Sequence, residues 1–374
     1  GGVLMSVAKG SGNESLAHKY FSTAMISAAV VSVCFAVFGA IFFDPMMYAL
    51  GADTTNIELV RGYGLCYTVS APLFIFSSSL QSFIRNDKSP RHAMIAVLTG
   101  SGLNILLDYL FIFVFKMGMF GASFATSIGT SITVCILIIH FFTKKNTMRF
   151  SFRFFSIKAL WEIAKCGFSS FLIECANAVL VFVFNHTLLK YIGSVGVTVY
   201  SIMSNVAVVC MSLFNGVTLA AQPIIATNHG ADNHKRVLQV RHIGTITSSV
   251  IAVIIFCVGF FFPDLLIYSY VKDPTPEILE LARYALRIYF FAYLFMNFNI
   301  FFSGYFQSTL RPVAAITIQI LRSLLLSSVL VSVLPMIFGA DAIWYAVPIT
   351  ECITFFVAMA FLFFGRFQKT KDAK

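Results

Sequence analysis

The stretch ELVRGYGLCY at residues 58–67 recurs as ELARYALRIY at residues 280–289. Two further pairs keep nearly the same separation: FIRNDKSP (83–90) with YFQSTLRP (305–312), and GMFGASFA (118–125) with GADAIWYA (339–346). All three pairs are offset by 221 or 222 positions. Self-similarity at a fixed offset is typical of a structure built from repeated units. The sequence therefore predicts two related halves that follow each other along the chain.

The residues around these motifs form one apolar run after another. Of the 374 residues, 58% are hydrophobic and 11% are charged, whereas about a quarter of the residues of a soluble domain are charged. A membrane span takes about 20 apolar residues, and continuous apolar runs indicate helices rather than barrel strands. We predict an all-α polytopic membrane protein. The expected spans are 20–43, 60–83, 92–115, 119–142, 162–189, 195–226, 241–269, 281–306, 313–337 and 341–365.

The repeat also predicts what each half contains. If Gly1 pairs with Ala221 and the second half starts near Ile157, about 64 residues of that half have no counterpart in the first. We expect helix 1 and most of helix 2 in a preceding segment, with about ten helices and a stub in this chain. Two six-helix lobes would then form a parallel repeat. The predicted boundaries are 1–143 for the N-terminal lobe, 144–158 for a basic linker, 159–365 for the C-terminal lobe and 366–374 for a tail.

Lysine and arginine are distributed unevenly between alternate connections. The side that includes Lys9, the linker 144–158 and the tail carries 18 of the 26, and the opposite side carries six. Because basic residues accumulate in cytoplasmic connections, we expect a multi-pass plasma-membrane protein with a cytoplasmic C-terminus. The linker could rest on anionic headgroups, although a topology anchor is the simpler role.

The same distribution excludes other classes of partner. The basic residues lie in short connections rather than in one stripe, so we expect no nucleic-acid partner. The eight cysteines and seven histidines show neither metal-ligand nor disulfide spacing, so we expect no metal site and no cofactor.

Acids inside predicted spans are costly, at least about 2.5 kcal/mol each on insertion scales, so each is a candidate functional residue. Glu174 shares a helical face with Ser170, Asn177 and Asn185. It could exchange a proton or, when ionised, hold a monovalent cation. The alternative is a neutral acid that is hydrogen-bonded between helices.

Two more acids and one arginine are candidates for the same site. Asp108 follows Asn104 by one helical turn; the alternative for Asp108 is a structural carboxylate at headgroup level. Glu351 follows Pro348, whose ring loosens the helix locally, and it could instead bond a neighbouring helix. Arg322 is the predicted charge partner of one of these acids, with contact to the substrate as the alternative.

Neutral polar residues inside the spans form a second set. We predict four asparagines as polar groups of a substrate cavity, with hydrogen bonding between helices as the alternative. They are Asn104, Asn177, Asn205 and Asn297.

Several stretches resemble the MATE (multidrug and toxic compound extrusion) family, in particular its bacterial MepA-like branch. They include LQSFIRNDKSPRHAM (80–94), GLNILLDYLFIF (102–113), GFSSFLIECANAVLVFVFNHTLL (167–189), FNGVTLAAQPIIATNHGA (214–231) and IWYAVPITECIT (343–354). The resemblance implies two six-helix lobes around a central cavity and export of amphipathic, often cationic compounds. The driving force would be inward flow of Na⁺ or H⁺. We expect a monomer in a bacterial inner membrane that contributes to antibiotic resistance.

The resemblance implies roles for two acids of this sequence but does not identify the coupling ion. Glu174 matches the acid of the seventh helix in members that bind cations in the C-terminal lobe, and Asp108 matches the acid of the fifth-helix motif. Some members have an aspartate in the tenth helix, where this chain has Met296 and Asn297. The first-helix acid of other members would lie in the missing segment.

We therefore hypothesise a cation-coupled antiporter that works by alternating access, not an enzyme. A flippase for lipid-linked oligosaccharides would need a basic cavity for a diphosphate, whereas the spans hold three acids against Lys165 and Arg322. A membrane-embedded transferase would need acids or histidines clustered at one interface and a sizeable loop for its donor substrate. The connections here are short.

Overall fold

A computed structural model describes residues 1–49 and 57–371, apart from the side chains at 49, 169, 170, 172, 173, 176, 177 and 364–371. The fold is all-α and polytopic as predicted, and the described residues contain no strand. The chain divides into two compact units, Gly1–Ala164 and Lys165–Lys374. The predicted linker 144–158 lies within unit 1.

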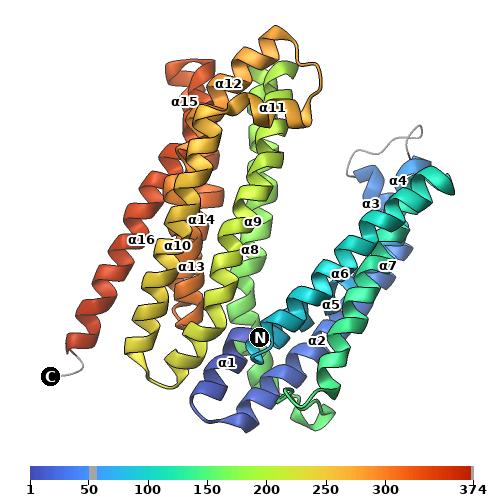
Figure 1. Cartoon of the computed structure of the whole chain (residues 1–374), viewed down its shortest axis with the longest axis vertical. Helices are drawn as coiled ribbons and strands as arrows, with labels where there is room; N and C mark the ends of the chain where they lie inside the picture. The colour runs from blue at the N-terminus through green and yellow to red at the C-terminus, as the bar shows by residue number, and fades with distance from the viewer. Residues whose placement is uncertain (50–56, 372–374) are drawn as a thin grey trace. The chain divides into compact units, whose positions relative to one another are not determined.

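Unit 1 is a bundle in which α6 packs along α7, while α4 and α5 also contact α7 (Figure 1). Its helices are α1 (Gly2–Gly10), α2 (Glu14–Ile41), α3 (Phe43–Ala49), α4 (Ile57–Val69), α5 (Ala71–Asn86), α6 (Pro90–Asp108), η1 (Tyr109–Val114), α7 (Gly118–Ile139), η2 (His140–Phe142) and η3 (Phe152–Phe154). The segment after α7 runs back over α2, where the backbone N–H of Ser156 donates to Thr23 Oγ1 at 3.1 Å.

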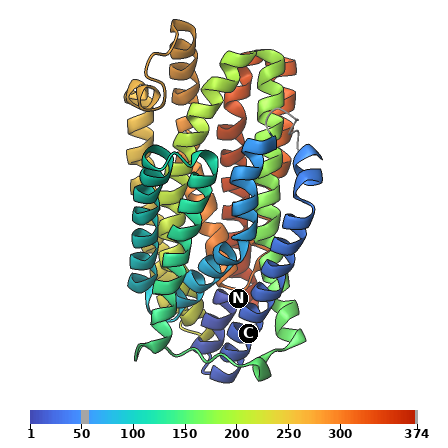
Figure 2. The same cartoon turned by 90° about the vertical axis from the view of Figure 1, so that its right-hand side faces the viewer.

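Unit 2 is built around α9, α10 and α13, which contact one another (Figure 1; Figure 2 gives the view turned by 90°). Trp344, Tyr293 and Phe290 lie in its core and are almost fully buried. The helices are α8 (Ile157–Tyr191, which begins in unit 1), α9 (Ser194–Gly230), α10 (His234–Phe261), α11 (Pro263–Tyr270), α12 (Pro276–Phe290), α13 (Tyr293–Ser308), α14 (Pro312–Ile320), η4 (Leu321–Leu325), α15 (Leu326–Phe338), η5 (Ala340–Tyr345) and α16 (Ala346–Lys371).

The number of membrane spans agrees with the apolar runs of the sequence. Among the described residues, seven helices are long and apolar enough to cross a membrane, and two bent pairs raise the number to nine. The remaining predicted span, 162–189, falls on α8, several of whose side chains lie outside the described residues. The bends divide spans that the sequence predicts as continuous, 60–83 and 281–306. Pro72 at the start of α5 accounts for the first break, because proline cannot continue the backbone hydrogen bonds of a preceding helix.

The two units repeat the same structural features at nearly the predicted offset. The pair α4 and α5 is bent by 47°, and the pair α12 and α13 by 46°. An asparagine caps a helix at the corresponding turn of each unit, Asn13 for α2 and Asn233 for α10. A bidentate ion pair follows in both units, Arg61 with Asp44 and Arg283 with Asp264. The repeated sequence motifs therefore correspond to repeated structure.

The contact between α6 and α7 depends on glycine. A Cβ on Gly100 would lie 2.6 Å from the carbonyl oxygen of Gly129 and would also overlap the Thr133 hydroxyl. Two backbones can approach this closely only where side chains are absent, as at small-residue interfaces between membrane helices. Gly102, two residues further along α6, has open space around it.

These neighbouring glycines provide a matched test of the packing. We expect Gly100→Ala to lower stability by about 1–3 kcal/mol, because α6 and α7 must separate to admit the methyl group. Gly102→Ala should be neutral or slightly stabilising, since alanine favours the helix more than glycine does. Thermal unfolding of the two purified variants in detergent measures the difference, and equal melting temperatures would contradict the close packing.

Candidate functional site

A buried ion pair lies in unit 2 between η4 and α16. Glu351 is 2% exposed, and its Oε1 accepts a hydrogen bond from Arg322 Nε at 2.6 Å. Asn299 of α13 donates to the other oxygen, Oε2, at 2.7 Å, and to the Glu351 backbone carbonyl at 2.9 Å. Arg322 lies in a π-helical turn, a local widening that often occurs at functional sites. The cluster thus joins three elements that are distant in the sequence.

This geometry identifies Glu351 as the acid that Arg322 neutralises. Both carboxylate oxygens are already engaged, one by a guanidinium. A cation could bind there only by displacing Arg322, and breaking a buried pair is costly. The role of Glu351 in cation or proton binding stays a prediction, and its surroundings favour a structural role.

Two of the predicted cavity asparagines bond within unit 2. Asn297 is 1% exposed, donates to the carbonyls of Tyr293 and Leu294, and accepts from Ser248 of α10 at 3.3 Å. Asn205 is exposed on α9 and donates to the Ser201 carbonyl of its own helix. Asn297 therefore connects helices, whereas Asn205 remains accessible to a ligand.

Asp108 and Asn104 lie near the end of α6. Asp108 is the last residue of the α-helix, is half-buried and precedes the π-helical turn η1. Asn104 reaches Thr126 of α7 at 3.4 Å. Within the described residues no group donates a hydrogen bond to the Asp108 carboxylate.

Glu174 is exposed on α8, and no described residue forms a hydrogen bond or ion pair with it. The side chain of Asn177, on the same predicted face, lies outside the described residues. Of the three predicted acids, Glu174 is thus the most exposed and Glu351 the most completely paired. Their assignment as ion ligands stays a prediction.

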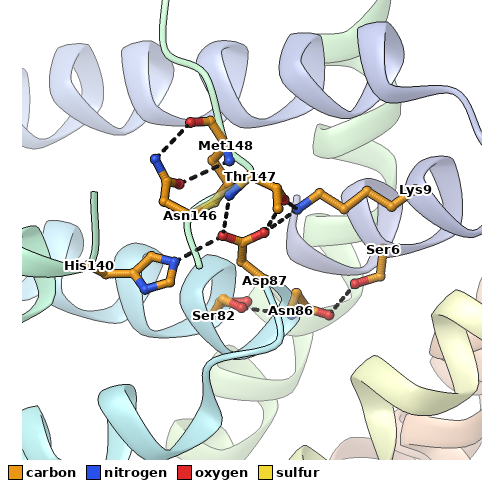
Figure 3. A network of polar contacts seen from close by, with 9 residues as sticks. All are labelled: Ser6, Lys9, Ser82, Asn86, Asp87, His140, Asn146, Thr147 and Met148. Atoms are coloured by element: carbon orange, nitrogen blue, oxygen red, sulfur yellow. Dashed lines mark hydrogen bonds and ion pairs between the residues drawn. The ribbon is translucent and has the colours of Figure 1, made fainter. Parts of the chain in front are cut away.

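A second polar cluster, which the sequence does not predict, surrounds Asp87 in unit 1 (Figure 3). Asp87 caps the end of α5 and is 1% exposed. Its carboxylate accepts from His140 Nε2 at 2.9 Å, from the Thr147 backbone N–H at 3.0 Å, from the Thr147 hydroxyl and from Lys9 Nζ. These donors come from α1, from η2 just after α7, and from the segment that follows it.

The hydrogen bonds outweigh the burial of this carboxylate. Burial by itself raises the pKa of Asp87, but donation from Lys9, Thr147 and His140 lowers it, and the net pKa lies below the ordinary value of 3.8. Asp87 is therefore ionised near neutral pH, and its carboxylate holds four segments together. Next to it, Asn86 extends the network by accepting from Ser6 Oγ at 2.6 Å.

The sequence offered one signal for this cluster. The repeated turns FIRNDKSP and YFQSTLRP differ in that Asp87 corresponds to Thr309. Thr309 bonds only to carbonyls of its own helix, Tyr305 and Phe306, among the described residues. Because the corresponding turn of unit 2 forms without an acid, Asp87 must have a separate role. The sequence does not predict that its partners are Lys9, His140 and Thr147.

Comparisons with known proteins agree with this architecture. A MatE family model matches residues 2–110 and 166–333. The multidrug export protein MepA of Staphylococcus haemolyticus is 26% identical over 374 residues, which are all of this chain and 82% of that protein. MepA of Staphylococcus saprophyticus subsp. saprophyticus is 27% identical over 331 residues, 88% of this chain and 72% of that protein.

Two solved structures share the fold at 19% sequence identity. One is described as the outward-facing conformation of a multidrug resistance MATE family transporter of the MOP superfamily. It has a TM-score of 0.91 and covers 99% of this chain and 82% of its own. The other is a MOP superfamily transporter from Pyrococcus furiosus, with a TM-score of 0.91 over 100% of this chain and 83% of its own. At this identity the likeness concerns the fold alone.

The buried pair in unit 2 can be tested with single and double substitutions. Arg322→Met leaves the Glu351 charge buried without its partner, and we expect a loss of about 3–5 kcal/mol. Adding Glu351→Gln removes that charge and should recover most of the loss. Thermal unfolding of the variants in detergent measures both effects. A double variant as unstable as Arg322→Met would contradict the assigned pairing.

The Asp87 cluster predicts a defined pH dependence. Because the pKa of Asp87 is lower in the folded protein than in the unfolded chain, its stabilisation is present above the unfolded pKa. The stabilisation is lost as pH falls through the folded value, below 3.8. Asp87→Asn should therefore cost about 1–3 kcal/mol near neutral pH and progressively less as the medium becomes more acidic. Melting temperatures across pH measure this, with Asp232→Asn at an exposed turn as the neutral control.

Proposed function

The chain belongs to the MatE family, and from this premise we propose that it is a secondary transporter that exports amphipathic, often cationic organic compounds. The main support is that the family model and the MepA multidrug export proteins match both units of the chain. The internal repeat is also typical of secondary transporters. The described residues contain no group of three or more His, Cys, Asp or Glu placed to hold a metal ion.

We propose that transport is antiport with Na⁺ or H⁺ by alternating access. A carboxylate that binds either the coupling ion or a cationic compound makes the two compete, so that ion binding favours release of the compound. A coupling site must lose and regain its charge partner in every cycle. It therefore requires an acid that is accessible and not held by a fixed cation.

Glu174 meets this requirement best among the acids inside the spans. It is exposed and makes no ion pair with a described residue, whereas Glu351 is held by Arg322 and Asn299. Asp108 is half-buried and has no hydrogen-bond donor in the described part of the chain, which makes it the second candidate. Asn104, Asn177 and Asn205 would contribute neutral polar contacts to the substrate.

The orientation belongs to the same proposal. The connections rich in Lys and Arg would face the cytoplasm of a bacterial cell, together with the C-terminus. Substrate would enter the monomeric transporter from that side or from the inner leaflet, and the ion would enter from outside.

The carboxylate of Glu174 provides the direct test. In proteoliposomes, Glu174→Gln should insert normally, but its rate of ion-driven uptake of a fluorescent organic cation should fall about tenfold or more. The reason is that a neutral amide cannot bind and release a proton or compensate the charge of a cation. Initial rates under an imposed Na⁺ or pH gradient measure this loss.

Glu280→Gln is the matched control, because Glu280 is an exposed acid on α12. It should transport at the rate of the unsubstituted protein. If Glu174→Gln also kept that rate, the assignment of Glu174 as the coupling acid would be wrong.

A further inference from the structure

A pocket of about 550 Å³ lies beside the Asp87 cluster of unit 1. One wall is formed by residues 88–92, the turn before α6 and the beginning of that helix. The other is formed by His140 and by Thr143 to Lys145, just after α7. We call it the basic pocket because its charged lining residues are Lys88, Arg91, Lys144 and Lys145.

The charges of the basic pocket are not compensated by acids. None of its four lysine and arginine side chains forms an ion pair with a described residue, and no acid lines it. Asp87 precedes Lys88 in the sequence, but its carboxylate is taken by Lys9, His140 and Thr147 (Figure 3). Four like charges around one cavity repel one another, and an anion in the cavity would remove that cost.

A buried hydroxyl in the lining also lacks a partner. Ser89 lines the basic pocket, is 6% exposed and occupies the N-cap position of α6. Its Oγ makes no hydrogen bond with the described residues, and it does not cap the helix. A buried polar group without a partner is costly. The start of a helix is also a favourable place for a negative charge.

The internal repeat shows that the turn itself does not require these residues. Lys88 and Leu310 occupy corresponding positions and adopt the same left-handed conformation, with φ of 60° and 55°. Leu310 carries no charge, and Val313 stands where Arg91 stands in unit 1, while Arg311 takes the place of Ser89. The left-handed backbone of the turn is thus retained in unit 2 without cations at the positions of Lys88 and Arg91, so the turn does not require these two cations in order to fold.

We propose that the basic pocket binds a phosphate group, carried by an anionic lipid headgroup or by a soluble phosphate compound. Lysine and arginine would bind the phosphate oxygens by charge-assisted hydrogen bonds, and the Ser89 hydroxyl would donate to one of them. The ligand would link α6 to the segment after α7. In the proposed orientation the pocket faces the cytoplasmic leaflet, where anionic lipids attract basic groups.

Two double substitutions distinguish specific binding in the basic pocket from general electrostatic attraction to the basic segment. Lys144→Gln with Lys145→Gln removes two charges from the pocket. Arg153→Gln with Lys158→Gln removes two charges from exposed positions of the same basic segment, outside the pocket. Ser89→Ala leaves the charge unchanged and removes only the buried hydroxyl.

The experiment titrates the full chain with two probes by calorimetry. Inorganic phosphate is added to protein in phosphatidylcholine nanodiscs, and short-chain phosphatidylglycerol is added to protein in neutral detergent. We expect saturable binding of at least one probe, weakened about tenfold or more by the pocket double variant and roughly fivefold to tenfold by Ser89→Ala. The Arg153 and Lys158 double variant should bind like the unsubstituted protein.

The two arms identify the source of the phosphate. Binding of phosphatidylglycerol alone indicates a lipid site, and binding of inorganic phosphate indicates a soluble ligand. Absence of saturable binding in both arms would overturn the proposal. Equal losses in the two double variants, or an affinity unchanged by Ser89→Ala, would overturn it as well.

Discussion

Inside a bilayer a buried polar group has no water to bond, so it must find its partners within the protein. In unit 2 this constraint brings Arg322 and Asn299 to the carboxylate of Glu351. In unit 1, Asp87 lies at the end of the bundle. Because it is almost fully buried there, its carboxylate also accepts hydrogen bonds from within the protein, from Lys9, His140 and Thr147. Each cluster joins segments that are far apart in the sequence. Internal pairing of charge therefore fixes the helices of each unit.

The same constraint gives meaning to the acids that remain without a fixed partner. A coupling ion must arrive and leave in every cycle, so its ligand cannot be neutralised permanently by an arginine. Glu351 is held in this way, whereas Glu174 is exposed and makes no ion pair with a described residue. We therefore propose that Glu351 and Asp87 stabilise the structure, whereas Glu174 exchanges cations.

The sequence predicts the architecture well because apolar runs and repeated motifs can be read directly from it. Apolar runs give the spans, and the fixed offset predicts that the second half repeats the first. The paired bends and the ion pairs of Asp44 and Asp264 follow that repeat, although the sequence predicts neither. The partner of Arg322 could not be chosen from the sequence, since three acids were available and only packing selects one. The Asp87 cluster was missed because its donors are separated from it by tens of residues. The break between Phe290 and Tyr293 carries no proline to reveal it.

Ion-coupled exchange at an unpaired carboxylate can be tested by a single flux measurement. Proteoliposomes carrying the full-length protein are loaded with Na⁺ or with acid, in separate experiments, and diluted into a fluorescent organic cation without that gradient outside. For an antiporter, we expect outward flow of one of the two ions to drive accumulation of the dye above its equilibrium level, and the matching ionophore to abolish this accumulation. Dye uptake that is the same with and without either gradient would contradict ion coupling.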